Sequence, residues 1–442
     1  MDLRKRIKTL VIIMALYAPL LSFSQDQNSK DSFLSLAELE TAMLDKSLDL
    51  RSVAIEVEAA KEKRYALPSI HVPKLTLDGN YKYLSEIPEI NMAPGRTLKF
   101  GDNKNYSIGP TVSMTLLDFN AKSHQQASLD KKVSSKENEA ESLKANLLFK
   151  TRYHYLNLVF LVEKRNLISE SLKVARKQLK DVSAQKRFGA GSKLDLLTAQ
   201  KEVHELESQH KEIIINIMAE QTELFKLTFH PKIKEVSFID DTGQLQKLPE
   251  LQHRFFKYHK TKLDPQANSK IKSIRDQSES LESQAKSIIS QRYPKINLFA
   301  RTSLEYPNGP DHTQFNQNSF GVSISMPLFD GGEISHNIRE KSLQAMALKQ
   351  QALNEERNLD ESIQLTIKRI ESLIGQSEII QKKVDESSEI ARLVYKSYQE
   401  GRATFLEVER ANIKSRESKL SLSSNHYQIT LNLIQLANVA GE

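Results

Sequence analysis

The 442-residue chain contains one long unit twice. Residues 109–200 recur without a gap as residues 321–412, so that each position has its counterpart 212 residues later. The segment MTLLD at 114–118 matches MPLFD at 326–330, and far downstream Gly189 matches Gly401. Duplication on this scale predicts a fold that is built twice from one plan.

The first 24 residues have the features of an export signal. A basic start that includes Arg4 and Lys8 precedes an apolar run from Leu10 to Leu21, and small residues follow before Gln25. The run is shorter than the ~20 residues of a membrane helix, so we predict a secretory signal peptide at 1–24, with a membrane anchor as the alternative. Its removal lowers the formal net charge from +7 to +4, because it holds four Lys/Arg and one Asp. This small excess does not require a nucleic-acid partner.

Composition and motifs argue against catalysis. The chain has no Cys, which excludes disulfide scaffolds, thiolate nucleophiles and thiolate metal sites. His204-Glu205 lacks the second histidine of a zinc-protease motif, and residues 189–193 (GAGSK) lack the order of a phosphate-binding loop. We therefore expect no enzyme activity, no catalytic residues, no cofactor and no metal site.

Segments with alternating polar and apolar residues occur once in each copy, at 75–83 and 107–116 and again at 296–306 and 320–328. A period of two fits strands with one face in lipid and one in water, and it equally fits a half-buried sheet of a soluble protein. We predict strand hairpins at about 69–118 and 295–329, with turn-rich loops at 88–105 and 307–318. Four strands cannot close a membrane barrel, whereas three chains would supply twelve.

Behind each hairpin lies a stretch of about 65 residues, 121–187 and 333–398, with no Pro and almost no Gly. As helices these would be ~100 Å long. Each carries apolar residues at the alternating four- and three-residue spacing of a coiled coil. These seams are Ile168, Leu172, Ala175, Leu179 and Val182 in the first copy, and Ile380, Val384, Ser387, Ala391, Val394 and Tyr398 in the second. Asp118 and Asp330 are expected to cap the strand-to-helix transitions.

The chain is thus divided into a first repeat at 25–230, a linker at 231–265 and a second repeat at 266–442. Each repeat comprises a leading helix, a strand hairpin and a long helical hairpin. The helical hairpins extend over about 121–229 and 333–440, with tips near 189–192 and 399–404. The linker is rich in Lys and Pro and lacks the heptad pattern, and we expect it to form an equatorial belt outside the helices.

In this arrangement the chain resembles the TolC-like outer membrane efflux protein family. The resemblance rests on the strand exits at 116–120 (LLDFN) and 328–332 (LFDGG), the entry prolines Pro68 and Pro294, and the tips at 189–200 and 398–408. It implies a mixed α+β membrane protein, in which a trimeric twelve-stranded outer-membrane β-barrel continues into a periplasmic α-helical barrel. It further implies an exit duct for efflux or type I secretion in the outer membrane of a Gram-negative bacterium.

The resemblance also implies partners and sites. The duct would be a homotrimer that contacts outer-membrane lipid and docks to a periplasmic adaptor protein, and through it to an inner-membrane transporter. A closable periplasmic gate would include Asp195, Glu407 and Tyr398, and adaptor docking would involve Gly189, Gly191, Gly401 and Thr404. A ring of carboxylates in a narrow lumen favours cations. As alternatives, Asp195 and Glu407 are helix-start carboxylates favoured by the helix dipole, and the glycines only allow tight reversals.

Two other classes of function fit parts of the pattern. A non-transporting periplasmic coiled coil would keep the alternating segments out of lipid, and a basic coiled coil that binds anionic polymers would be soluble and salt-sensitive. Only a duct explains why alternating strands precede each long helical hairpin. Neither the substrate nor the choice between efflux and secretion follows from the sequence.

Overall fold

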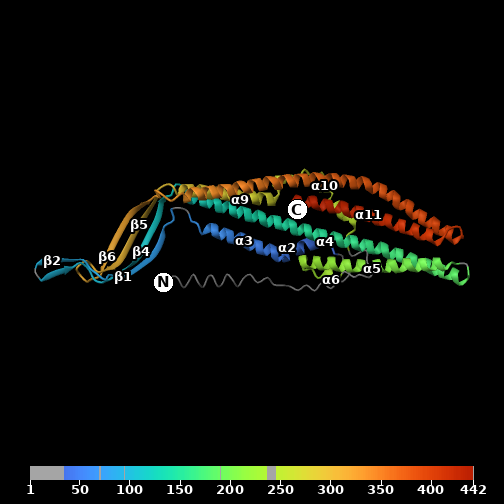
Figure 1. The fold of residues 1–442 in the computed structure, drawn as a ribbon, viewed down its shortest axis with the longest axis horizontal. Coiled ribbons are helices and arrows are strands. Elements are labelled where there is room, and N and C mark those ends of the chain that lie inside the picture. The colour runs from blue at the N-terminus through green and yellow to red at the C-terminus, as the bar shows by residue number, and fades with distance from the viewer. Residues whose placement is uncertain (1–33, 69–70, 94, 190, 236–244, 442) are drawn as a thin grey trace, which may run out of the picture.

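The computed structural model describes residues 34–441 except 69–70, 94, 190 and 236–244. The signal peptide predicted at 1–24 lies outside these described residues. The protein is elongated, with a β-sheet at one end and the tips of two helical hairpins at the other (Figure 1). No helix in the described ranges is long and apolar enough to span a membrane.

The main sheet joins the two repeats. Its strands are β1 (Lys74–Tyr83), β4 (Lys104–Leu117), β5 (Lys295–Tyr306) and β6 (Phe315–Ser325), paired antiparallel in the order β1-β4-β5-β6. Because β4 belongs to the first repeat and β5 to the second, their pairing forms a continuous sheet from both copies. The strands are 10, 14, 12 and 11 residues long, about the length that crosses a bilayer when tilted.

The register sorts the side chains of the sheet onto two faces. One row across all four strands is Leu75, Val112, Ala300 and Phe320, and the next is Thr76, Thr111, Arg301 and Ser319. Successive residues of a strand point to opposite faces, so one face is apolar and the other polar. The alternation seen in the sequence is therefore coherent across the whole sheet.

Three details of the predicted strand hairpins were wrong. The loop expected at 307–318 ends earlier, because β6 already begins at Phe315, which pairs with Glu305. The second hairpin was expected to reach residue 329, but β6 ends at Ser325, which pairs with Lys295 at the start of β5. If the pairing continued, the residue after Ser325 would stand opposite Pro294. The following Pro327 has no N–H to donate, so the hydrogen-bonded ladder ends there. In addition, the stretch 88–105 is not only a loop, because β2 (Glu89–Ala93) and β3 (Arg96–Lys99) form a small hairpin within it.

Two long helical hairpins extend from the sheet. The first comprises α4 (Ala121–Arg187) and α5 (Lys193–Thr228), and the second α10 (Glu333–Gln399) and α11 (Phe405–Val439). Both α4 and α10 contain 67 residues, about 100 Å of helix. Before them, Asp118 and Asp330 accept backbone N–H bonds from Lys122 and Ile334, as expected for caps.

The hairpins pack side by side, with α4 and α11 as the inner helices and α5 and α10 as the outer ones. α4 contacts both α5 and α11, whereas α10 contacts α11 and α9 (Ser269–Ser290). The first helices, α2 (Leu36–Lys46) and α3 (Leu48–Tyr65), lie against α4. The mixed α+β fold with an internal repeat is confirmed.

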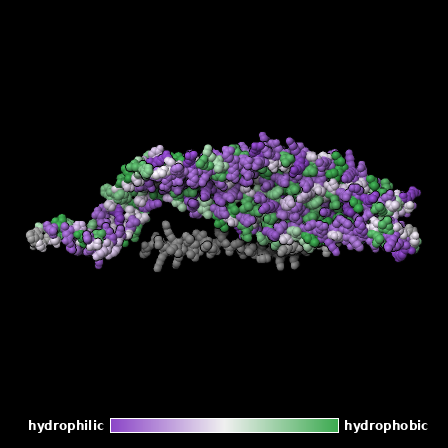
Figure 2. Space-filling model, viewed as in Figure 1, coloured by the Kyte–Doolittle hydropathy of each residue, from purple (hydrophilic) through white to green (hydrophobic). Residues whose placement is uncertain are grey.

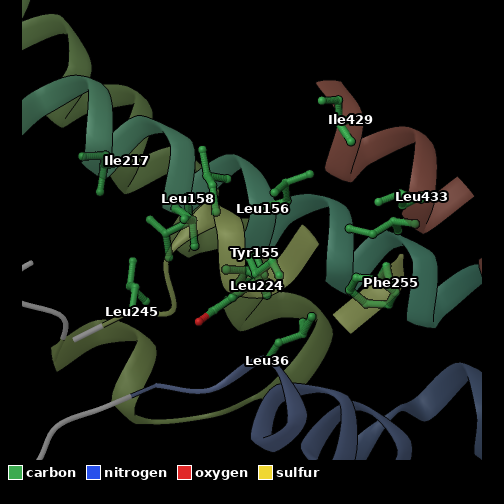
Figure 3. Close-up of a cluster of buried hydrophobic side chains, with 14 of the residues drawn as sticks. Leu36, Tyr155, Leu156, Leu158, Ile217, Leu224, Leu245, Phe255, Ile429 and Leu433 are labelled. Atoms are coloured by element: carbon green, nitrogen blue, oxygen red, sulfur yellow. The ribbon is translucent and has the colours of Figure 1, made fainter. Parts of the chain in front are cut away.

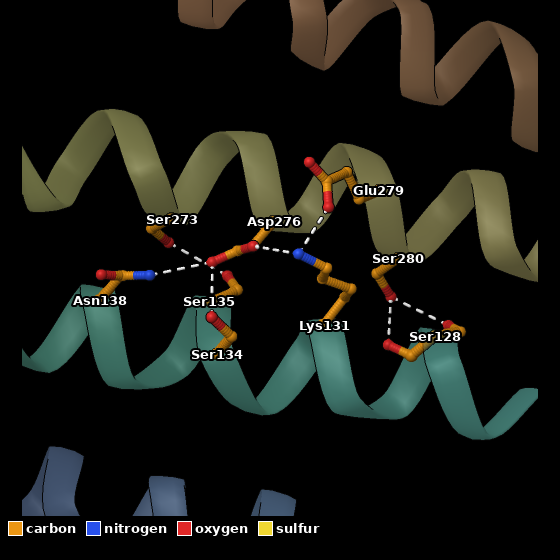
Figure 4. Close-up of polar contacts among 9 residues, drawn as sticks. All are labelled: Ser128, Lys131, Ser134, Ser135, Asn138, Ser273, Asp276, Glu279 and Ser280. Carbon is orange, nitrogen blue, oxygen red and sulfur yellow. Dashed lines mark hydrogen bonds and ion pairs between the residues drawn. The ribbon is translucent and has the colours of Figure 1, made fainter. Parts of the chain in front are cut away.

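A polar seam connects α9 to α4 (Figure 4). Ser128 and Ser135 of α4 contact Ser280 and Ser273 of α9 through their hydroxyl groups, at 3.0 and 3.1 Å, in a buried interface. Between them, Asp276 accepts bonds from Lys131 (3.3 Å), Ser134 (2.7 Å) and Asn138 (2.9 Å). Small side chains allow the helices to approach closely, and every carboxylate contact is satisfied by a donor.

The hydrophobic core lies near the middle of the helical part, where α2, α4, α5 and α11 meet (Figure 3). The segment after the first repeat joins this core, with α6 (Lys232–Glu235), α7 (Leu248–Phe255), α8 (Lys257–Lys260) and the 3₁₀ turn η1 (Pro265–Ala267). Tyr155 is fully buried and donates its hydroxyl to the Leu34 carbonyl at 2.7 Å. Glu40 accepts bonds from Arg152 (2.6 Å) and Arg254 (2.5 Å), which ties α2, α4 and α7 together.

Candidate functional site

The tip of the second helical hairpin is built by a reversal at Gly401. Its φ of +74° lies in the left-handed region that favours glycine. Thr404 then begins α11 with a capping box: its hydroxyl accepts from the Glu407 N–H (3.3 Å), and the Glu407 carboxylate accepts from the Thr404 N–H (2.7 Å). The bonds that the carboxylate accepts from the Thr404 N–H and then from the Thr404 hydroxyl hold the pKa of Glu407 below its ordinary value. Glu407 is therefore a negatively charged helix cap.

The tip of the first hairpin makes the same reversal with different residues. Gly189 has a φ of +77°, and a Cβ on Gly191 would lie 2.7 Å from the Lys186 nitrogen, so both positions require glycine. Ser192 begins α5 by accepting the Leu194 N–H at 3.0 Å. Phe188 lies at the reversal and is 87% exposed. The first tip thus presents an aromatic ring to solvent.

Tyr398 lies where the two hairpins meet, just above the tips. It is buried, stacks edge-on against Phe405 with ring centroids 5.5 Å apart, and donates its hydroxyl to Gln185 of α4 at 2.7 Å. Burial, followed by the charges of Asp195 and Asp181, raises the pKa of Tyr398. The predicted pair Tyr398 and Asp195 is therefore brought within electrostatic range.

Further polar contacts near the tips were not predicted from the sequence. Tyr395 donates to Asp181 at 2.6 Å, and burial together with this carboxylate raises the pKa of Tyr395 to about 12. Deeper along the helices, Asn412 donates to Gln178 at 3.0 Å and Arg416 to Glu202 at 2.7 Å. With the Tyr398–Gln185 bond, these contacts join the two hairpins; we refer to the four as the tip latch.

A signal for the tip latch was present in the repeat. The members of each latched pair are 213, 214 or 234 positions apart in the chain. Three of these separations are close to the 212-residue repeat, because corresponding residues of the two hairpins lie at the same height above the tips. Which polar residues face each other still depended on helix rotation, which the sequence pattern did not specify. Glu407, by contrast, faces its own helix start rather than the other hairpin.

The sheet end carries exposed apolar side chains. Leu75 is 73% exposed, Phe320 90% and Ile324 68%, and all three belong to the apolar face defined by the register. Figure 2 shows hydrophobic side chains over the sheet and between hydrophilic ones along the helices. Monomeric soluble proteins rarely expose so extended an apolar surface. Among the described residues, no group of three or more His, Asp or Glu could hold a metal ion.

Comparison with known families agrees with this architecture. The model of the outer membrane efflux protein family matches residues 41–227 and 266–442. The chain belongs to this family. The two matched segments fall in the two repeats and leave out residues 228–265 between them. No curated protein matches the chain by sequence.

Solved structures share the fold of this outer membrane efflux protein at low sequence identity. The outer membrane protein VceC from Vibrio cholerae is 16% identical with a TM-score of 0.75, over 92% of this chain and 96% of that one. CusC is 16% identical with a TM-score of 0.76, over 95% of each chain. The open state of the outer membrane channel MtrE from Neisseria gonorrhoeae is 14% identical with a TM-score of 0.72, over 94% and 93%.

Family membership establishes the broad function. The protein is an exit duct for efflux across the outer membrane, and members of this family are passive channels rather than enzymes. The predictions of family, fold class and export function are confirmed.

Proposed function

We propose that three copies of this chain close into one duct, whose sheets form a twelve-stranded barrel in the outer membrane and whose helices form a tunnel in the periplasm. The observation that carries this proposal is that the outer helix α10 exposes many more large apolar side chains than the inner helix α4. The outer helix α10 has seven strongly exposed large apolar residues: Leu343, Met346, Leu353, Leu365, Ile379, Ile390 and Leu393. Its counterpart α4 has one, Val174, at 48%.

The repeat explains this imbalance. Within one chain, α11 of the second copy covers α4 of the first, so Gln178 is only 5% exposed, while its counterpart Ile390 on α10 is 54% exposed. In the repeat, α10 corresponds to α4 and α5 corresponds to α11. If the packing of α11 on α4 is repeated between chains, α5 of a neighbouring chain covers α10. That helix also exposes apolar residues: Leu194, Leu197, Ile215 and Met218. A head-to-tail contact of this kind must close into a ring or grow without end.

The leading helices support the same arrangement. α9 lies against both α4 and α10 of its own chain, whereas its counterpart α3 contacts α4. The free side of α3 carries Leu48 at 66% and Ile55 at 68% exposure, and α10 of a neighbour would cover it. Three chains give a closed barrel of twelve strands, with the apolar face toward lipid and the polar face toward the lumen.

In this duct the tips are the periplasmic entrance. The gate would comprise Tyr398, Asp195 and Glu407, and the tip latch would hold the two hairpins of each chain together in the closed state. Asp195 in the first turn of α5 and Glu407 in its capping box each place a negative charge at a helix start. Three copies of both would line a constriction that favours cations.

A periplasmic adaptor protein, itself joined to an inner-membrane transporter, would dock at the tips. Gly189, Gly191 and Gly401 allow close approach of a partner helix, and Thr404 fixes the start of α11. Phe188 offers an aromatic anchor of the kind that dominates protein interfaces. Between the repeats, the segment 231–265 would form a belt on the outside of the tunnel.

Crosslinking tests the assembly directly, because the native chain has no Cys. Gln178 and Asn412 touch within one chain, and their repeat counterparts are Ile390 and Gln200. We therefore expect Ile390→Cys/Gln200→Cys to give a ladder between chains that ends at three, with a short thiol-specific crosslinker. The matched control Gln178→Cys/Asn412→Cys should crosslink only within a chain. A ladder that ends at two chains, or none, would contradict the trimer.

A further inference from the structure

A hollow of about 740 Å³ lies where the sheet meets the helices. Its walls are the polar face of the sheet, the first turn of α4 and the last turns of α9. The sheet contributes Lys74, Thr115, Asn297 and Lys295, and the helices contribute Lys122 and Ser287. We refer to it as the junction hollow. Its size suits a small organic ligand.

The charges that line the junction hollow are mostly positive. Three lysines, at 74, 122 and 295, face one carboxylate, Asp118. That carboxylate already accepts the backbone N–H of Lys122 at 3.1 Å as a cap. Within the described part of the chain, no ion pair involves the ammonium groups of Lys74 or Lys295, and both residues are exposed. The positive charges of Lys74 and Lys295 are therefore left for a ligand.

Elsewhere on the polar face, Arg301 of β5 has partners of its own. Arg301 donates to Ser107 at 2.7 Å and lies within electrostatic range of Asp78. The repeat reproduces the lysines of the strands but not the lysine of the helix. Lys295 begins β5 as Lys74 begins β1, whereas the counterpart of Lys122 in the second copy is Ile334.

We propose that the junction hollow binds anionic groups of the transported cargo, such as carboxylates, phosphates or sulfonates. This inference rests on the proposed function, since the hollow opens into the duct only when the polar face of the sheet is turned inward. Ammonium groups attract the anion, and the surrounding hydroxyl and amide groups of Thr115, Asn297 and Ser287 supply hydrogen bonds to its oxygens. Three hollows around one lumen would concentrate anions at the entrance to the barrel.

Binding of pyranine, a fluorescent trianionic sulfonate, tests this site on the full-length protein in detergent. We expect the anisotropy of the dye to report saturable binding that weakens as salt rises. The variant Lys74→Gln/Lys295→Gln should bind about tenfold more weakly, because two cations that line the hollow each contribute a modest, partly screened attraction. The matched control Lys177→Gln/Lys180→Gln removes two exposed lysines from α4, about 85 Å along the helix from Lys122, and should bind as the wild type does.

Conductance in planar bilayers separates this inference from the proposed function. All three proteins should form channels of the same single-channel conductance. If pyranine blocks the wild type and the control but not Lys74→Gln/Lys295→Gln, both the duct and the anion site are supported. If all three proteins form channels and bind the dye equally well, the anion site is overturned and the duct is left intact. A wild-type affinity that does not change with salt overturns the site whatever the variants do. Absence of any conductance from the folded protein overturns the duct and the inference that rests on it.

Discussion

The tip latch offers a quantitative test of the proposed gate. The double variant Tyr395→Phe/Tyr398→Phe removes two hydroxyl groups and leaves both rings in place. The lost bonds are Tyr398 to the Gln185 amide oxygen at 2.7 Å, and Tyr395 to the Asp181 carboxylate at 2.6 Å. A neutral bond contributes about 1 kcal/mol and one to a charged group about 1.5–3 kcal/mol.

Tyr398 is buried, but Tyr395 lies only partly inside the protein near the tip, so water can replace part of the Tyr395 bond. Taking the lower end of the range for the charged bond gives about 2.5 kcal/mol per chain. Because 1.4 kcal/mol corresponds to a factor of ten, the equilibrium between latched and separated hairpins should shift by roughly 60-fold in each chain.

Single-channel recording in planar bilayers measures this shift. We expect the double variant to open more often, or to a larger conductance, than the wild type. Tyr427→Phe is the matched control, since it removes a hydroxyl bond of 2.6 Å to Asn157 that also joins α11 to α4, but far from the tips. An unchanged open probability in the double variant, or an equal increase in the control, would refute the assignment of the gate to the tip latch.

Four further predictions concern the entrance, the assembly and the core, and two of them are made at Glu407. Glu407→Gln should retain the capping box and lose only the charge, whereas Glu407→Ala loses both. We expect the cation selectivity, measured by reversal potential, to fall in both variants, which would identify the charge as the cause. Because the pKa of Glu407 is lowered in the folded protein, its ionised carboxylate stabilises the protein at pH values above the ordinary pKa of 4.5, and this contribution is lost as the pH falls through the lowered pKa. Thermal unfolding of the wild type and of Glu407→Gln at pH 7 and pH 3 measures this loss. Ile390→Glu should prevent trimer formation, seen by gel filtration with light scattering, because the exposed apolar face of α10 would then bury a charge. Glu40→Ala should destabilise the protein by about 3–5 kcal/mol in urea unfolding, since it leaves the buried Arg152 without its carboxylate.

The long helices and the sheet could be predicted from the sequence because their signals are local. The absence of Pro and Gly from 121–187 leaves no residue to end a helix, and α4 covers these residues. The alternation in β1 and β4 likewise has a period that only a strand satisfies. Prediction was weaker at the end of β6, where the limit depended on which residue of β5 stood opposite.

The sequence by itself determined that the chain is built twice, with a strand hairpin and a long helical hairpin in each copy, because repeat and periodicity are properties of the residues alone. Only the tertiary structure decided which surfaces remain uncovered. The seams on α4 and α10 look alike in sequence, yet α11 buries Val182 completely while Val394 stays half-exposed. The grouping of Lys74 with Lys295 was also decided there. These features depend on helix rotation and strand pairing across more than 200 residues, which no local pattern records.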